Sequence, residues 1–246
     1  SEGNVLVNAQ DDVTAVLTSG AGAGGGNTGV GASLAVATLL GTTKAYVGDN
    51  ARVNARGNRD AATVYTGDTV ITQQPDSPAR PGDLLAKKTE LAKGLSVTAY
   101  NRENLVTTVV GGAGGGTAGV AATVSANVIA NTTEATIGRG AKINENNATA
   151  GAEQQVRVKA VDETLLINTA GAGAGGGSAG VGAAANVGVV AKTTKAWIGR
   201  GALVNAKQAV ELDAASSALT FSTTAGFAGG GSAGVGGAVA GVGVAN

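Results

Sequence analysis

The chain has 246 residues, 42 of them Gly, and contains no Cys, His or Met. Its 17 Lys and Arg residues balance 17 Asp and Glu, so no overall field favours a nucleic acid or an anionic membrane. Without Cys and His, a disulfide scaffold and the thiolate and imidazole chemistry of most nucleophilic and zinc sites are excluded. The chain opens at Ser1 without Met or a signal peptide, and we expect it to be a segment of a longer protein.

The first expected strand is the alternating segment VLVNA, which ends at Ala9. A Gly- and Ala-rich stretch follows, with the motif GGGNTGV from Gly24. Then TKAYVG begins at Thr43, 17 residues after the last Gly of the triplet, and VNA begins at Val53. The hydrophobic period of two and the Val, Ile and Thr content favour short strands, and the Gly that closes TKAYVG suits a corner.

These landmarks recur in a fixed order. Segments like VLVNA end at Ala9, Ala99, Ala160 and Ala214, and 15 residues separate each Ala from the first Gly of a triplet. The triplets, which we expect to be structural glycines, are Gly24, Gly25, Gly26; Gly114, Gly115, Gly116; Gly175, Gly176, Gly177; and Gly229, Gly230, Gly231. They are spaced by 90, 61 and 54 residues, and the additional length falls after the VNA landmark. The repeats are therefore approximately 1–55, 95–145, 156–206 and, incomplete, 210–246, with insertions at 56–94 and 146–155.

Side-chain alternation gives each repeat an inner and an outer face. In VRVKA, Val156, Val158 and Ala160 are expected inside, and in TKAWIG, Lys195 and Trp197 are expected outside. Asn205 of the third VNA landmark is likewise assigned to the outside. Short strands that recur this way predict one all-β domain, residues 1–246: a parallel β-solenoid of 54-residue Gly/Ala-rich repeats with one inserted loop-and-helix excursion.

The stretch GAGAGGGSAGVGAAANVGVV, from Gly171 to Val190, has Ala172 and Ala174 on one face and Gly on the other. We expect two strands that meet at the triplet and form a thin part in which a neighbouring sheet approaches closely. The alternative is a membrane-inserting hairpin, because the uncharged runs are long enough to span a bilayer. They lack, however, the Leu and Phe of a spanning helix and a flanking aromatic belt. Neither phosphate-binding glycine motif is present.

The excursion 56–94 holds all three prolines. It predicts a hairpin around Gly67 and a helix from Asp83 to Lys93, capped by Asp83 and ended by Gly94. It is interpreted as a decoration or a cover for the solenoid, and alternatively as a recognition loop. The residues that could bind a partner are Arg80, Lys87 and Lys88 in the excursion and Tyr46 and Trp197 in an outward-facing row.

Two acidic pairs, Asp11–Asp12 and Asp162–Glu163, follow the VxVxA segments. They are interpreted as solvated turns rather than as acid–base pairs. GDNARVN from Gly48 raises the alternative of calcium binding, but it lacks the repeated GGxGxD of calcium-binding β-rolls. No catalytic residue, metal or cofactor is expected.

The combined pattern VxVxA, AGxGGGxAGVGAA and TxAxIGxxAxVNA resembles the repeats of large exported bacterial proteins, the filamentous-haemagglutinin-like adhesins and especially the leukotoxin-type filamentous adhesins. The resemblance covers nearly the whole chain except 56–94. It implies a β-helical shaft, export across an outer membrane through a partner or autotransporter barrel, and a role in adhesion or biofilm. It carries no catalytic residue over to this chain.

We therefore expect a non-enzymatic shaft segment of a long fibre or adhesin, outside the cell or on the bacterial surface. Its expected partners are neighbouring repeats of the same chain or end-to-end copies of itself, beside an unidentified host or cell-surface ligand, with no nucleic acid and no membrane. Two alternatives stay open. The first is a self-assembling extracellular filament or surface-layer subunit, and the second is a membrane-active toxin segment whose Gly/Ala-rich hairpins insert into lipid.

Overall fold

The computed structural model describes residues 2–68 and 88–245, which form strands joined by turns and irregular segments. The strands are β1 (Val5–Gly25), β2 (Thr28–Val47), β3 (Arg52–Val53), β4 (Ala62–Tyr65), β5 (Thr89–Gly115), β6 (Ala118–Ile137), β7 (Lys142–Ile143), β8 (Gln154–Gly176), β9 (Ala179–Ile198), β10 (Leu203–Val204), β11 (Ala209–Gly230) and β12 (Ala233–Ala245). The long strands have 13 to 27 residues, whereas strands in globular proteins usually have about 3–10.

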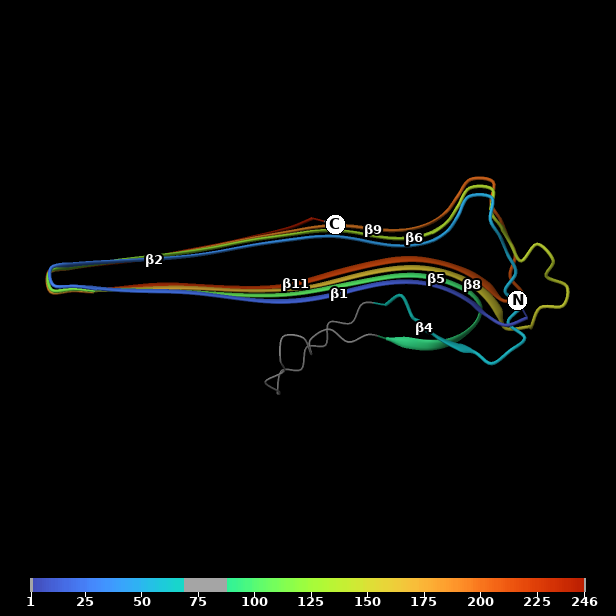
Figure 1. The fold of residues 1–246 in the computed structure, drawn as a ribbon, viewed down its shortest axis with the longest axis horizontal. Coiled ribbons are helices and arrows are strands. Elements are labelled where there is room, and N and C mark those ends of the chain that lie inside the picture. The colour runs from blue at the N-terminus through green and yellow to red at the C-terminus, as the bar shows by residue number, and fades with distance from the viewer. Residues whose placement is uncertain (1, 69–87, 246) are drawn as a thin grey trace.

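Each repeat contributes one long strand to each of two parallel sheets. The order is β1-β5-β8-β11 in the first sheet, which β4 extends by antiparallel pairing with β5, and β12-β9-β6-β2 in the second. A third small sheet has the order β10-β7-β3. The two large sheets form two layers that join at one narrow end and diverge at the other (Figure 1).

Equivalent landmarks of successive repeats pair in register. In the first sheet Ala9 pairs with Ala99, Ala99 with Ala160, and Ala160 with Ala214. The triplets pair in the same way, beginning with Gly24 and Gly114. The segments that carry these landmarks therefore lie side by side as parallel strands in register.

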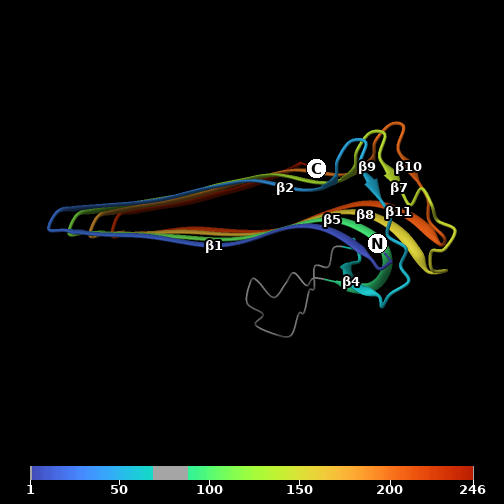
Figure 2. The ribbon, with the colours of Figure 1, turned by 45° about the vertical axis from the view of Figure 1, so that its right-hand side comes forward.

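The glycine triplets mark the narrow end of the molecule, as the sequence predicts. β1 ends at Gly25 and β2 begins at Thr28, and the other repeats turn at the equivalent place (Figure 2). The hydrogen-bond ladder continues across this turn, where the amide of Thr117 donates to the carbonyl of Asn27 at 2.8 Å. The amide of Ser178 donates to the carbonyl of Thr117 at 2.9 Å. The turns are thus stacked like the strands.

The three glycines of a triplet have different reasons to be glycine. A Cβ at Gly176 would overlap the carbonyl oxygen of Ala179, and one at Gly177 would overlap that of Gly116. A Cβ at Gly175 would meet open space, so the first position needs no glycine for lack of room. The same division between first and second positions holds in all four triplets.

In the thin part of the molecule, the glycines that allow the two sheets to approach lie on β9. The sequence predicted this role for the glycines of β8. Ala172 and Ala174 face the interior, while the other face, with Gly171 and Gly173, is open to solvent. The glycines that admit the facing sheet lie on β9, where a Cβ at Gly182 would overlap the carbonyl oxygen of Phe227. Ala on one sheet therefore packs toward Gly on the other.

The wide end has the predicted aliphatic core. Val156, Val158 and Ala160 are 0% exposed and pack with Ile137 and Ile143 of the facing elements. The expected inward faces of VxVxA, TxAxIG and the Val or Ile of VNA are confirmed by this cluster, and Lys195 and Trp197 face outward as expected. At the corner after these strands, positive φ angles occur at Asn50, Gly140 and Gly201 rather than at the closing glycines.

Two local predictions are wrong. The expected helix of Asp83–Lys93 is not found, since Thr89 to Ala92 are β-strand that pairs with β4, and residues 83–87 lie outside the described residues. The acidic pairs are not in turns, because β1 and β8 continue through them to the glycine triplets. Adjacent strand residues point to opposite faces, so Asp162 faces the interior and Glu163 the outer side, and both are 0% exposed.

Asn205 also differs from its expected role as a free outward residue. Its side-chain amide donates to the carbonyl of Asn144 at 3.2 Å, and the amide of Asn144 donates to the carbonyl of Asn205 at 2.9 Å. Asn144 is 1% exposed and its side-chain oxygen accepts the backbone amide of Ala55 at 2.8 Å. The VNA asparagines thus link neighbouring repeats at the wide end.

Candidate interaction surfaces and a buried polar cluster

The three proposed partner-binding residues that the structure describes do not lie together in one site. Tyr46 and Trp197 lie in one row across the outer face of the second sheet, with Thr136 between them. Lys88 is exposed beside β4, which extends the first sheet on the opposite side of the molecule (Figure 1). Arg80 and Lys87 lie outside the described residues.

The aromatic row has a charged neighbouring row. Lys44 pairs in register with Glu134, and Glu134 with Lys195. The indole of Trp197 donates to Glu134 at 2.6 Å, and the Lys44 ammonium lies 3.2 Å from the same carboxylate. The hydrogen bond from Trp197 is the main reason that the pKa of Glu134 is below its usual range. Trp197 is therefore held against the sheet, whereas Tyr46 is 66% exposed.

Toward the narrow end, a long part of the molecule contains no charged residue. We call residues 13–43, 104–133, 164–191 and 214–245, which contain no Asp, Glu, Lys or Arg, the uncharged arm. On the outer face of its second sheet, large apolar side chains stand exposed: Val30, Leu34, Val36, Leu40, Val120, Val124, Val128, Val181, Val187, Val189, Val235 and Val239. The outer face of the first sheet has Thr and Gly together with exposed Val16, Val110, Phe221 and Phe227. Exposed apolar side chains of the arm are thus more numerous on the second sheet but occur on both.

The described parts of the excursion lie over the outer face of the first sheet. The ring of Tyr65 stacks on that of Tyr100, and the Tyr65 hydroxyl donates to Gln10 at 2.6 Å. Arg157 of β8, 4% exposed, pairs with Glu90 and lies 3.3 Å from Glu211 of β11. The excursion therefore connects to three strands of this sheet.

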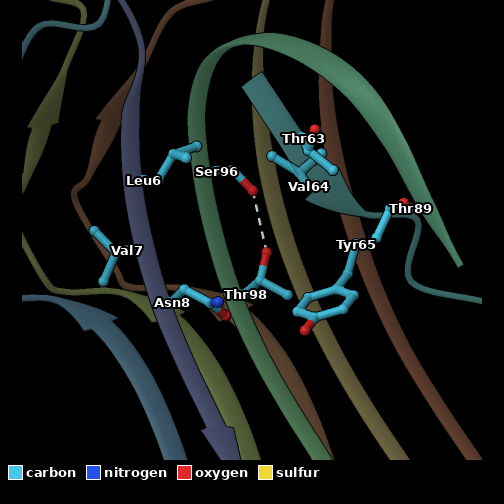
Figure 3. Close-up of a pocket in the computed structure, with 9 residues that line it drawn as sticks. All are labelled: Leu6, Val7, Asn8, Thr63, Val64, Tyr65, Thr89, Ser96 and Thr98. Carbon is cyan, nitrogen blue, oxygen red and sulfur yellow. Dashed lines mark hydrogen bonds between the residues drawn. The ribbon is translucent and has the colours of Figure 1, made fainter. Parts of the chain in front are cut away.

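A recess opens between the excursion and the sheet (Figure 3). It has a volume of about 170 Å³ and is lined by β1 at Leu6–Asn8, β4 at Thr63–Tyr65, and Thr89, Ser96 and Thr98 of β5. The hydroxyl groups of Ser96 and Thr98 lie 3.1 Å apart and are hydrogen-bonded to each other. None of the described lining residues is charged, so the recess offers hydroxyl, amide and apolar contacts and no acid–base group.

A cluster of charged and polar groups lies between the two sheets, at the inner end of the arm. Lys192 of β9 meets Asp162 of β8, with 2.6 Å between Nζ and Oδ1, and both side chains are 0% exposed. Lys192 Nζ also donates to the carbonyl of Ser217 at 2.8 Å. The hydroxyl of Thr133 donates to Asp162 Oδ2 at 2.9 Å. Burial, as the largest influence, lowers the pKa of Lys192.

Glu103 of β5 is part of this cluster and is 2% exposed. Asn101 donates a hydrogen bond to Glu103, and the Thr164 hydroxyl donates to its Oε2 at 2.9 Å. Burial and the nearby charge of Asp162 raise the pKa of Glu103 to about 7, despite these two donors. Glu103 is thus a carboxyl group that can stay protonated near neutral pH.

On the outer side of the same strands, Tyr100 donates to Glu163 at 2.7 Å. Burial and this carboxylate raise the pKa of the Tyr100 phenol above its ordinary value. The sequence did contain a signal that Asp162 and Lys192 face the interior. Asp162 continues the inward alternation of Val156, Val158 and Ala160, and Lys192 shares its parity with the inward Ala196 and Ile198.

Residues 2–68 and 88–245 contain no helix that could be a membrane-spanning helix. Within the same part of the chain, no three acidic side chains converge as metal ligands would. Asp49, from the stretch considered for calcium, accepts the backbone amide of Arg139 at 2.7 Å. The chain matches no family model, no curated protein and no solved structure.

Proposed function

We propose that the chain is a segment of a parallel β-solenoid that serves as the shaft of a long extracellular bacterial fibre or adhesin, and that it acts structurally rather than as an enzyme. The observation that carries the proposal is the in-register parallel ladder of repeats, which leaves β1 and β2 at one edge and β11 and β12 at the other. The resemblance of the repeats to those of filamentous adhesins supports the extracellular location.

The edges support stacking of further repeats. Leu212 aligns with the inward Val158 and is 49% exposed, because no described strand follows β11 in the sheet. Both backbone edges and an apolar interior are thus available to another strand pair of the same pattern. Exposed edges of this kind favour pairing with a further chain or repeat. That repeat can belong to the same chain or to a second copy of it.

A tandem chain tests this proposal. A second copy of residues 95–245, joined after Ala245 through a copy of residues 131–155 that completes the fourth repeat, should extend the molecule by about 4.8 Å for each added repeat, the distance between neighbouring strands. Electron microscopy and small-angle scattering would measure its length, and urea unfolding would measure its stability. A single elongated body of higher stability is expected. Two separate bodies joined by a linker would contradict the shaft.

Light scattering of the unmodified chain distinguishes a shaft completed by its own repeats from a self-assembling filament. Concentration-dependent end-to-end growth would favour the filament or surface-layer subunit. Loss of that growth in the Leu212→Lys variant would place the contact at the open edge. A chain that stays monomeric at every concentration would indicate that neighbouring repeats of the same chain complete the open edges of the sheets.

The uncharged arm favours a second candidate function, insertion into lipid. The apolar strip from Val30 to Leu40 spans roughly 33 Å at about 3.3 Å per residue, close to the ≈ 30 Å hydrocarbon core of a bilayer. Against it, the edge strands β2 and β12 would bring unpaired backbone groups into lipid, which costs several kcal/mol for each group. Dye release from neutral liposomes by the wild type, lost in Val187→Lys but kept in Val110→Lys on the opposite face, would support this function.

A further inference from the structure

The pair Lys192–Asp162 has a geometry that an ordinary ion pair does not need. Its two members come from opposite sheets, β9 and β8, and meet in the interior with 0% of either side chain exposed. Nζ lies only 2.6 Å from Oδ1, yet Oδ1 has no hydrogen-bond partner, because the contact does not meet hydrogen-bond geometry. The amine nitrogen therefore lies in direct contact with the carboxyl group.

The other carboxyl oxygen is fixed. Asp162 Oδ2 accepts from the Thr133 hydroxyl at 2.9 Å and is 3.4 Å from the side-chain nitrogen of Asn101. Lys192 Nζ is in turn anchored by the carbonyls of Ser217 at 2.8 Å and Asp162 at 3.2 Å. Residues of five strands, β5, β6, β8, β9 and β11, thus hold the nitrogen and the carboxyl group in one relative position.

The surroundings favour the uncharged form of the Lys192 amine. Burial lowers the pKa of Lys192, and charged forms are costly in a dry interior. Transfer of one proton from Nζ to the Asp162 carboxylate gives an amine and a carboxylic acid, which are the two partners of an amide condensation.

We propose that Lys192 and Asp162 condense spontaneously to an isopeptide bond that links the two sheets. The Nζ lone pair attacks Cγ of Asp162 and forms the C–N bond. The bond between Cγ and one carboxyl oxygen then breaks, and that oxygen leaves as water with the proton of the acid and one proton of the amine. Nothing is oxidised or reduced, and no co-reactant is needed.

Proximity lowers the barrier to this reaction. Reacting groups held in place can behave as if present at concentrations on the order of 10⁵ M or more. Exclusion of water from the site, where both side chains are 0% exposed, also opposes the reverse hydrolysis. A condensation that is unfavourable between free lysine and aspartate in water can therefore proceed here.

Glu103 is the positioning residue of this reaction. Asn101 donates to Glu103 and also faces Asp162 Oδ2, so it joins the two carboxyl groups. Since its pKa is raised to about 7, Glu103 is protonated at lower pH and can relay protons toward the departing oxygen. The other ionisable groups near Glu103 are Asp162 and Lys192 themselves. Asp11 of β1 lines the same surface recess as Glu103.

Among the repeats, the described equivalents of this pair lack the amine. Asp11 and Gly41 occupy the two positions in the first repeat, and Asn101 and Asn131 occupy them in the second. One bond is therefore expected, in the third repeat. It would clamp the sheets where the arm meets the wide end, whatever the function of the whole protein.

The test is the intact mass of the purified, denatured chain. The wild type should be lighter than its sequence by one water molecule, and tandem mass spectrometry should find a branched peptide joining Lys192 to Asp162. Lys192→Arg keeps the positive charge but cannot condense in this way, and Asp162→Ala removes the acceptor. Both variants should have the full mass, and circular dichroism would show that Lys192→Arg is folded.

A folded wild type with the full mass after prolonged incubation would overturn the proposal. A chain that has lost water but remains unbranched would also overturn it, since that product is an ordinary cyclic imide. Glu103→Gln should slow the loss of water in freshly folded protein several-fold and abolish its decline above pH 7. An unchanged rate and pH profile would remove Glu103 from the mechanism while leaving the bond itself in place.

Discussion

The rings of Tyr65 and Tyr100 stack with centroids 4.8 Å apart and planes 17° from parallel. Tyr65 belongs to β4 of the excursion and Tyr100 to β5, where it is 2% exposed. The excursion therefore packs on the outer face of the first sheet at this place.

Replacing Tyr65 with Ala should lower the free energy of unfolding by roughly 1–3 kcal/mol, because the stacking and the hydroxyl contact with Gln10 are both lost. Urea unfolding would measure it. Tyr46→Ala is the matched control, since that ring is 66% exposed, and it should change the stability by less than about 0.5 kcal/mol. Equal losses in the two variants would show that the excursion does not cover the sheet.

Two neighbouring glycines of one strand should respond differently to the same substitution. Gly176→Ala places a Cβ on the carbonyl of Ala179 and should cost roughly 1–3 kcal/mol by overpacking. Gly173→Ala places it in open space and should be neutral or slightly stabilising, because Gly is unfavourable inside a strand. Thermal unfolding of the two variants would measure these changes in stability. A larger loss of stability in Gly173→Ala than in Gly176→Ala would show that our assignment of the two faces is wrong.

Two substitutions can separate what the positive φ of 54° at Asn144 and the side-chain hydrogen bonds of this residue each contribute to stability. Asn144→Gly keeps the backbone conformation but loses the bonds to Ala55 and Asn205, whereas Asn144→Ala loses both. We expect a loss of about 1–3 kcal/mol for Gly and a further loss of about 1 kcal/mol for Ala. Denaturant unfolding would measure both, and identical stabilities would mean that the backbone strain is negligible.

Glu103 should make the protein less stable as the pH rises. Its pKa in the folded state is about 7, above the ordinary value of 4.5, so folding favours the protonated form. The contribution is fully present below about pH 4.5 and is lost as the pH rises to about 7, in total about 3 kcal/mol. Burial is its largest cause and acts whether or not Asp162 is ionised.

Comparison of the wild type with Glu103→Gln in urea at pH 5 and pH 8 checks this sign. The stability of Glu103→Gln relative to the wild type should be higher at pH 8 than at pH 5. A wild type that gains stability over this range relative to the variant would show that the paired, ionised form of Glu103 is the native one.

The sequence by itself determined the repeat, its register and its inner face. Invariant offsets between VxVxA, the triplet and TxAxIG placed each landmark beside its equivalent, because a parallel ladder pairs residues at constant separation along the chain. Alternation assigned Val156, Val158 and Ala160 to the core, since successive side chains of a strand point to opposite faces.

Only the tertiary structure decided how far each strand extends and what its polar residues contact. An acidic pair after five alternating residues is typical of a turn, yet β8 continues through Asp162, whose side chain meets Lys192 of the facing sheet, 30 positions along the chain. Likewise, which glycines admit the facing sheet depends on the backbone of a different repeat, as at Gly182 and Phe227. Such contacts between distant segments leave little local signal, and the strand ladder alone brings them together.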